Sequence, residues 1–208
     1  MPISMRKSAV VIALTALTAL ASEGALAAAA SFRLFPNKPF KACFEQAGQT
    51  ARATAKVTRG TLNDTLVLNL SGFKPGLDFD LFTVEKSNQL ANGSPDPSFT
   101  SFGLAWYQSD VHVGADGTGS VTIRTILLDQ IFGFDPLVSL PPTNTFHVGF
   151  WFNRPGDAQP CGFNGPPTPF NGEHHAGPVA FITRPDATTG LGPLCTNPTS
   201  GPPFSCNP

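Results

Sequence analysis

The chain has 208 residues, of which 13% are charged, and its formal net charge is −1. This weak and balanced charge, without a basic run, argues against nucleic acid as a partner. The 21 prolines and 20 glycines favour turns over long helices. Eighteen phenylalanines against one tyrosine indicate a core filled by large apolar rings.

The first 30 residues have the pattern of a secretory signal peptide. Two basic residues are followed by an apolar run from Ala9 to Ala21, and small residues near Ala27 and Ala30 offer cleavage sites. The run is interrupted at Ser22 and is shorter than the roughly 20 residues that span a bilayer. We therefore expect a cleaved signal peptide over 1–30, no membrane span after cleavage, and a location in the periplasm or outside the cell.

Short segments of alternating apolar and polar residues follow along the rest of the chain, separated by turn residues. They predict strands at 42–45, 51–58, 65–71, 79–85, 102–108, 111–113, 120–127, 143–152 and 179–183. Apolar groups on both faces of 79–85 predict a strand that is covered on both sides. The pattern favours an all-β domain over 31–185, a single antiparallel β-sandwich of Ig-like or Greek-key type with about seven to nine strands. A Gly/Pro-rich tail follows over 186–208.

The clearest alternation lies between residues 146 and 153. One side of this strand is apolar and predicts the core, with Phe146, Val148, Phe150 and Phe152. The other side suits a flat ligand such as a sugar ring stacked on the tryptophan, and it carries His147, Gly149, Trp151 and Asn153. Because large rings are usually buried, the interpretation that the pattern favours more is that the 154–178 loop covers this face and that Trp151 anchors the loop. We expect a ligand-binding site formed by His147, Trp151, Asn153 and Glu173, with a carbohydrate or another envelope or extracellular protein as partner.

The 154–178 loop is too long for a simple connection, because structureless loops beyond roughly 12–15 residues tend to be functional or disordered. It contains His174 and His175 next to Glu173. Together with His147 and His112, these residues are of the types that bind zinc or copper, although no known metal spacing is present. A Cu- or Zn-binding protein, or a metal-dependent redox enzyme, is therefore the alternative to a binding protein without a cofactor.

Motifs of hydrolases and nucleotide-binding enzymes are absent from the sequence, including G-x-S-x-G and the phosphate-binding glycine loop. A glycosidase would need two carboxylates roughly 5–10 Å apart. Asp78, Asp80, Asp110 and Glu173 are the candidates, and nothing singles out two of them. A secreted hydrolase is thus a further alternative, and we favour a non-catalytic protein that binds a ligand or partner.

All four cysteines, Cys43, Cys161, Cys195 and Cys206, follow the predicted signal peptide. An even number in an exported chain predicts two disulfides. Of the three possible connectivities we favour Cys161–Cys195 with Cys43–Cys206, which would tie the long loop and the tail to the sandwich. A local Cys195–Cys206 bridge is the rival pairing.

The segment LVLNLSGFKPGLDFDLFTV resembles the strand–G-x-x-P-G–strand unit of copper/zinc superoxide dismutase and CHRD-type sandwiches. Those families carry histidine ligands on the second strand of the unit, where this chain has Asp78-Phe79-Asp80, so the resemblance does not imply their metal ligands. More broadly, FGLAWYQSDV, GSVTIRTILLDQ, TFHVGFWFN, TPFNGEHHAGP and TTGLGPLC are similar to a group of uncharacterised secreted bacterial proteins. That similarity implies export without an assigned activity.

Overall fold

The computed structural model describes residues 29–60, 63–103, 105–125, 145–166 and 176–195. Over these residues the protein is all-β, with short helical turns at η1 (Lys38–Phe40), α1 (Lys41–Phe44), η2 (Pro155–Asp157) and η3 (Gln159–Cys161). The strands are β1 (Ala29–Pro36), β2 (Arg52–Thr58), β3 (Asp64–Ser71), β4 (Asp78–Val84), β5 (Ala105–His112), β6 (Gly119–Thr125), β7 (Thr145–Phe152), β8 (Val179–Ile182) and β9 (Leu194–Cys195). None of the helices in the described part of the chain is long and apolar enough to cross a membrane.

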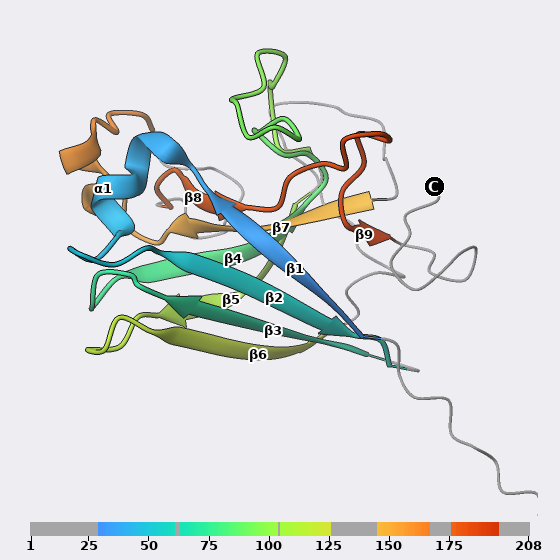
Figure 1. Ribbon diagram of the computed structural model, residues 1–208, viewed down its shortest axis with the longest axis horizontal. Coiled ribbons are helices and arrows are strands. Elements are labelled where there is room, and N and C mark those ends of the chain that lie inside the picture. Colours follow the sequence, from blue (N-terminus) through green and yellow to red (C-terminus); the bar gives the residue numbers. More distant parts are fainter. Residues whose placement is uncertain (1–28, 61–62, 104, 126–144, 167–175, 196–208) are drawn as a thin grey trace, which may run out of the picture.

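Eight of the strands form one nearly closed, barrel-like antiparallel sheet in the order β5-β4-β7-β8-β1-β2-β3-β6. Figure 1 shows β2, β3 and β6 below β7 and β8, with β1 crossing diagonally between the two groups. The first part of β1 pairs with β2, whereas Phe35 and Pro36 pair with β8. β1 is thus hydrogen-bonded to β2 at one end and to β8 at the other. The strands therefore form one continuous sheet, and not the two separate sheets of the expected sandwich.

The inward faces of these strands enclose the main hydrophobic core, as the alternation predicted. Phe146, Val148, Phe150 and Phe152 of β7 are all buried in it. Phe150 stacks on Phe181 of β8 with ring centroids 5.2 Å apart. Burial of one such ring stabilises the fold by roughly 1.5–3 kcal/mol. The many phenylalanines therefore supply much of the apolar surface that is buried when this chain folds.

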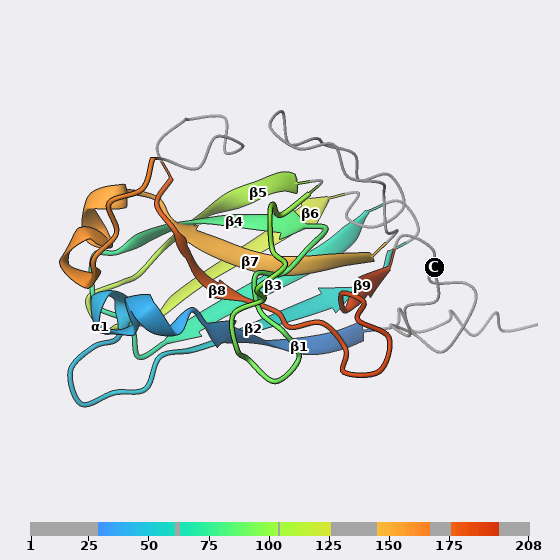
Figure 2. The ribbon, with the colours of Figure 1, turned by 90° about the horizontal axis from the view of Figure 1, so that it is seen from above.

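A second, smaller apolar cluster lies on the outer face of β4, β7 and β8. It consists of Phe82, Val84, Trp151, Ala176, Val179 and Ile182. The segment between β4 and β5, residues 85–103, folds back over this face, and Phe102 meets Trp151 edge-on at 4.8 Å. Figures 1 and 2 show this green segment rising above β7 and β8 beside the red segment that follows β8. The prediction that 79–85 is covered on both sides is thereby confirmed.

Three local predictions were wrong. Residues 42–45, expected as a strand, lie mostly in α1, where Pro39 starts a helical turn through η1. Strand β1 begins at Ala29, at the edge of the expected signal peptide, and was not anticipated. No strand was predicted in the Gly/Pro-rich tail over 186–208, yet Leu194 and Cys195 form β9 and pair with the start of β7.

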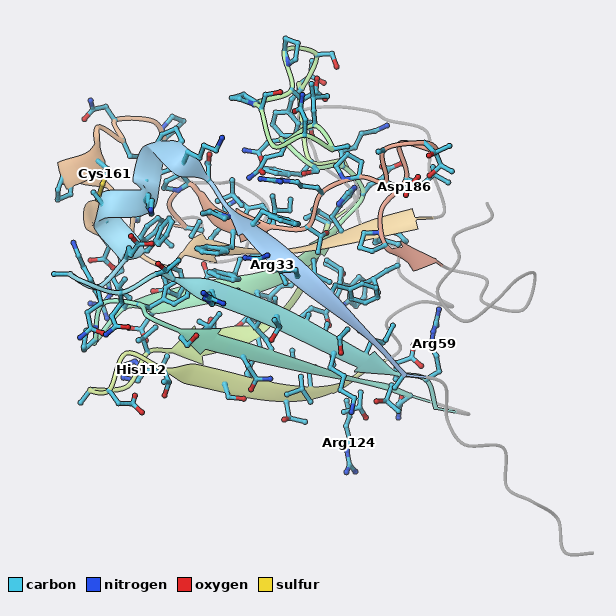
Figure 3. The ribbon with its side chains drawn as sticks, viewed as in Figure 1. Arg33, Arg59, His112, Arg124, Cys161 and Asp186 are labelled. Atoms are coloured by element: carbon cyan, nitrogen blue, oxygen red, sulfur yellow. A yellow bond between two sulfur atoms is a disulfide. The ribbon has the colours of Figure 1, made fainter. Side chains whose placement is uncertain are left out.

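The observed disulfide joins Cys43 of α1 to Cys161 of η3, with Cα atoms 6.0 Å apart. The favoured pairing of each of these cysteines with one in the tail is therefore wrong, although the expected stapling of the long loop to the body of the protein is present. Figure 3 shows this sulfur bridge near the label of Cys161. The rival Cys195–Cys206 bridge involves Cys206, which is outside the described residues.

Candidate functional site

The strongest candidate site is a cavity of about 420 Å³ on the outside of the barrel, hereafter the His147 cavity. It lies between the 85–103 segment, the start of β7 and the segment that connects β8 to β9. Its lining is rich in hydrogen-bonding groups and comprises Glu85, Lys86, Ser87, Gln89, Leu90, Asp96, Ser98, Phe99, Thr100, Ser101, His147, Pro185, Gly190, Leu191 and Gly192. Its volume falls in the range of small-molecule sites, roughly 300–1,000 Å³.

The outer apolar cluster positions the cavity wall formed by residues 85–103. Phe102 packs on Trp151, and the backbone N–H of Lys86 donates to the Phe102 carbonyl at 2.9 Å, which closes the base of the segment. The hydroxyl of Ser87 donates to the Thr183 carbonyl at 3.1 Å. These contacts hold residues 85–103 against β7 and β8. The wall of the His147 cavity is therefore fixed by packing and hydrogen bonds within the protein.

His147 lies at the inner wall of this cavity and is only 2% exposed. Its Nδ1 is 3.0 Å from both the backbone carbonyl and the hydroxyl oxygen of Thr183. Because a carbonyl oxygen only accepts hydrogen bonds, this geometry assigns the proton of the neutral ring to Nδ1 and leaves Nε2 as an acceptor.

Burial lowers the pKa of His147 from 6.5 to about 4. The hydrogen bond to Thr183 opposes this shift, and the charge of Lys86 adds slightly to it. The imidazole is therefore neutral at pH 7 and presents no positive charge to the cavity.

Two carboxylates and one aromatic ring define the rest of the lining. Glu85 is 3% exposed, and Asp96 is held by the backbone N–H and hydroxyl of Ser98. These hydrogen bonds from Ser98 lower the pKa of Asp96 and fix the orientation of its carboxylate. Phe99, half-buried, packs edge-on against Phe102 with centroids 4.7 Å apart.

The expected ligand-binding residues are not assembled as the sequence suggested. His147 lines the cavity, but Trp151 is 1% exposed and anchors the outer apolar cluster, so no sugar ring can stack on it. Its cover is the 85–103 segment together with Ala176. Asn153 lies further along β7 and donates from Nδ2 to Asp80 Oδ1 at 2.6 Å. Glu173 is outside the described residues.

The expected metal-binding histidines are also separated. On β4, Asp78 is the partner of His112 and Val84 is the partner of His147. Six residues at about 3.3 Å each place these two histidines roughly 20 Å apart along the strand, too far to share one metal ion. His174 and His175 are outside the described residues, and the described part of the chain contains no group of three or more His, Cys, Asp or Glu suited to a metal.

The candidate carboxylates of a hydrolase lie together on the outer face of β4 and β5, away from the His147 cavity. Asp78 is bound by His112 at 2.7 Å and by Arg154 at 3.4 Å. Asp80 accepts from Asn153, and Asp110 accepts from the Tyr107 hydroxyl at 2.8 Å. Each of the three is thus engaged with protein groups.

Sequence reasoning missed the residues that supply most of the cavity lining. Residues 86–101 lie between two predicted strands, and site residues were predicted on the 143–152 strand and on the loop that follows it instead. The connection between β4 and β5 spans about twenty residues, and its length alone could have marked it as a functional segment. Its aromatic pair Phe99 and Phe102, unusual in an exposed loop, was the second available signal.

Comparison of the chain with protein-family models, curated proteins and solved structures found no match. The resemblance of residues 66–84 to the superoxide dismutase and CHRD-type unit therefore remains a prediction.

Proposed function

We propose that this chain is an exported, non-catalytic binding protein whose His147 cavity holds a small neutral ligand rich in hydroxyl groups, of the carbohydrate class. The observation that carries the proposal is the lining of the cavity: carboxylates, hydroxyls and an amide surround a buried histidine that remains neutral. Buried polar groups of this kind act as ready-made partners for a ligand that both donates and accepts hydrogen bonds.

The charges of the lining favour a neutral ligand over an anion. Glu85 and Asp96 are two acids against the single cation Lys86, and the neutral His147 adds no charge. Carboxylates accept hydrogen bonds from sugar hydroxyls, and the Gln89 amide, which already binds the Pro36 carbonyl and Arg184 Nε, has one further N–H and one further lone pair. Phe99 offers an apolar ring against which the C–H face of a sugar can pack.

Export is supported by the disulfide as well as by the predicted signal peptide. A bridge between Cys43 and Cys161 is typical of oxidising compartments such as the periplasm or the extracellular space. Strand β1 begins at Ala29, so cleavage after Ala27 would keep the whole strand in the mature protein.

A screen of neutral mono- and disaccharides on an immobilised glycan array, followed by calorimetric titration of the hits, tests the proposal. Phe99→Ala removes the ring from the cavity and should weaken binding about tenfold, since stacking of this kind is worth roughly 0.5–1.5 kcal/mol beyond its buried area. Tyr107→Ala is the matched control, because Tyr107 is exposed on β5 and does not line the cavity.

Binding that is lost in Phe99→Ala and kept in Tyr107→Ala supports the His147 cavity as the site. Absence of binding to every neutral sugar would refute the assignment of ligand class. Equal weakening in both variants would place the ligand elsewhere on the protein.

A further inference from the structure

Two arginines from distant parts of the sequence meet over one aromatic ring on the outside of β1. The guanidinium carbon of Arg184, which follows β8, lies 3.8 Å from the centroid of the Phe35 ring. The guanidinium carbon of Arg33 lies 5.7 Å from the same centroid. Cation–π contact explains why each group is attracted to the ring, but it does not remove the repulsion between two like charges.

No acidic side chain among the described residues pairs with either arginine. Burial lowers the pKa of Arg184, and the charge of Arg33 lowers it further. Like charges that lie close together destabilise each other, and here Arg184 is partly buried whereas Arg33 is exposed. The fold therefore maintains a positive site that lacks a counter-charge from the described part of the protein.

The orientation of Arg184 is fixed by its neighbours. Its Nε donates to Gln89 Oε1 at 3.1 Å, and the Gln89 amide in turn donates to the Pro36 carbonyl at 3.2 Å. A Cβ added to Gly93 would collide with the guanidinium group, so the absence of a side chain there makes room for it. Of the five N–H donors of Arg184, the four on its two Nη atoms have no hydrogen-bond acceptor among the described residues.

A cavity lies beside Arg184, although neither Arg184 nor Arg33 is among its lining residues. Gln89 and Gly93, which contact Arg184, also line a cavity of about 380 Å³ together with Lys38 and Asn88. Lys38 adds a third positive charge to the same side of the protein. This cavity is separate from the His147 cavity, although Gln89 lines both.

We propose that Arg33 and Arg184, placed on the ring of Phe35, bind an oxyanion group of a ligand, such as the carboxylate, sulfate or phosphate group of an acidic molecule. Planar guanidinium groups recognise such oxygens by paired, charge-assisted hydrogen bonds. The bound anion supplies the missing counter-charge. This inference does not depend on the proposed sugar site, whose lining carries net negative charge.

The test is titration of the protein, purified with its disulfide intact, with sodium glucuronate, sodium sulfate and sodium phosphate at low ionic strength, followed by NMR shifts or calorimetry. Arg33→Gln and Arg184→Gln each remove one charge and its donors, and each should weaken binding roughly tenfold or more. The anion that binds most tightly identifies the preferred group. Raising the ionic strength should weaken binding, as expected for a partly exposed charged site.

Arg124→Gln is the matched control. Arg124 is exposed on β6 and projects away from the barrel well apart from Arg33 in Figure 3. Anion binding that is weakened by Arg33→Gln and Arg184→Gln but unchanged in Arg124→Gln supports the site. The Arg33 side chain is exposed and makes no hydrogen bond within the described residues. Arg33→Gln should therefore fold normally even if Arg184→Gln loosens the 85–103 segment.

Failure of all three anions to bind at millimolar concentration would overturn the proposal, as would equal weakening in Arg124→Gln. Either result leaves the sugar site untouched, because that site is tested by Phe99→Ala. Conversely, anion binding that persists in Phe99→Ala would show that the two sites act separately.

Discussion

Acidification should destabilise this protein through His147 before most of its carboxylates titrate. The pKa of His147 is about 4 in the folded protein, against an ordinary value of 6.5, because the ring is buried. Between these two values the unfolded chain binds a proton that the folded chain does not, so stability falls as the pH falls. The slope is about 1.4 kcal/mol per pH unit, and the full loss between pH 6.5 and pH 4 is about 3 kcal/mol.

Urea unfolding of the wild type and of His147→Gln at a series of pH values from 7 to about 4.5 measures this contribution. A glutamine has no charge to gain and can still donate a hydrogen bond to the Thr183 carbonyl. The wild type should lose most of the about 3 kcal/mol by the end of the series, while the variant should lose much less. Aspartate and glutamate begin to titrate only near the acid end.

His112→Gln is the control for loss of a histidine as such, because the His112 side chain is 65% exposed and pairs with Asp78 on the surface. The loss of stability that is due to His147 should still be present in this variant. If His147→Gln showed the same slope as the wild type, the imidazole would not be neutral and buried as the structure places it. The description of the cavity wall would then be wrong as well.

Three further perturbations test the core, the disulfide and the covering segment. Phe150→Ala removes a fully buried ring from the main core and should cost about 3–5 kcal/mol in the free energy of unfolding; an unchanged thermal midpoint would contradict the assigned face of β7. Replacing both Cys43 and Cys161 by Ser removes a disulfide whose cysteines are 118 residues apart in sequence. Urea unfolding should then show a free energy of unfolding that is lower by about 4–5 kcal/mol. A decrease below about 1 kcal/mol would mean that the disulfide adds little to stability. Gly93 has φ of 82° and lies against the Arg184 guanidinium group. Gly93→Ala should displace Arg184, so that residues 85–103 become the first site of limited proteolysis. An unaltered cleavage pattern would contradict the idea that Arg184 holds this segment in place.

The local pattern of the sequence predicted most of the strands and, in β7, which side chains face the core. In β7 the period of two residues separates Phe150, which enters the main core, from Trp151, which enters the outer cluster. This succeeds because side-chain direction in a strand depends only on neighbouring residues.

Contacts between residues far apart in the sequence determine the disulfide, the burial of Trp151 and the arginine pair. Cys43 and Cys161 pair because α1 and η3 lie together at one end of the barrel, and no spacing in the chain encodes that proximity. Trp151 is buried because residues 85–103 fold over it, and this covering also creates the His147 cavity. Arg33 and Arg184 meet because β1 pairs with β8 across the length of the chain. Periodicity along a strand reveals which face a residue occupies, but only the packed tertiary structure determines what covers that face.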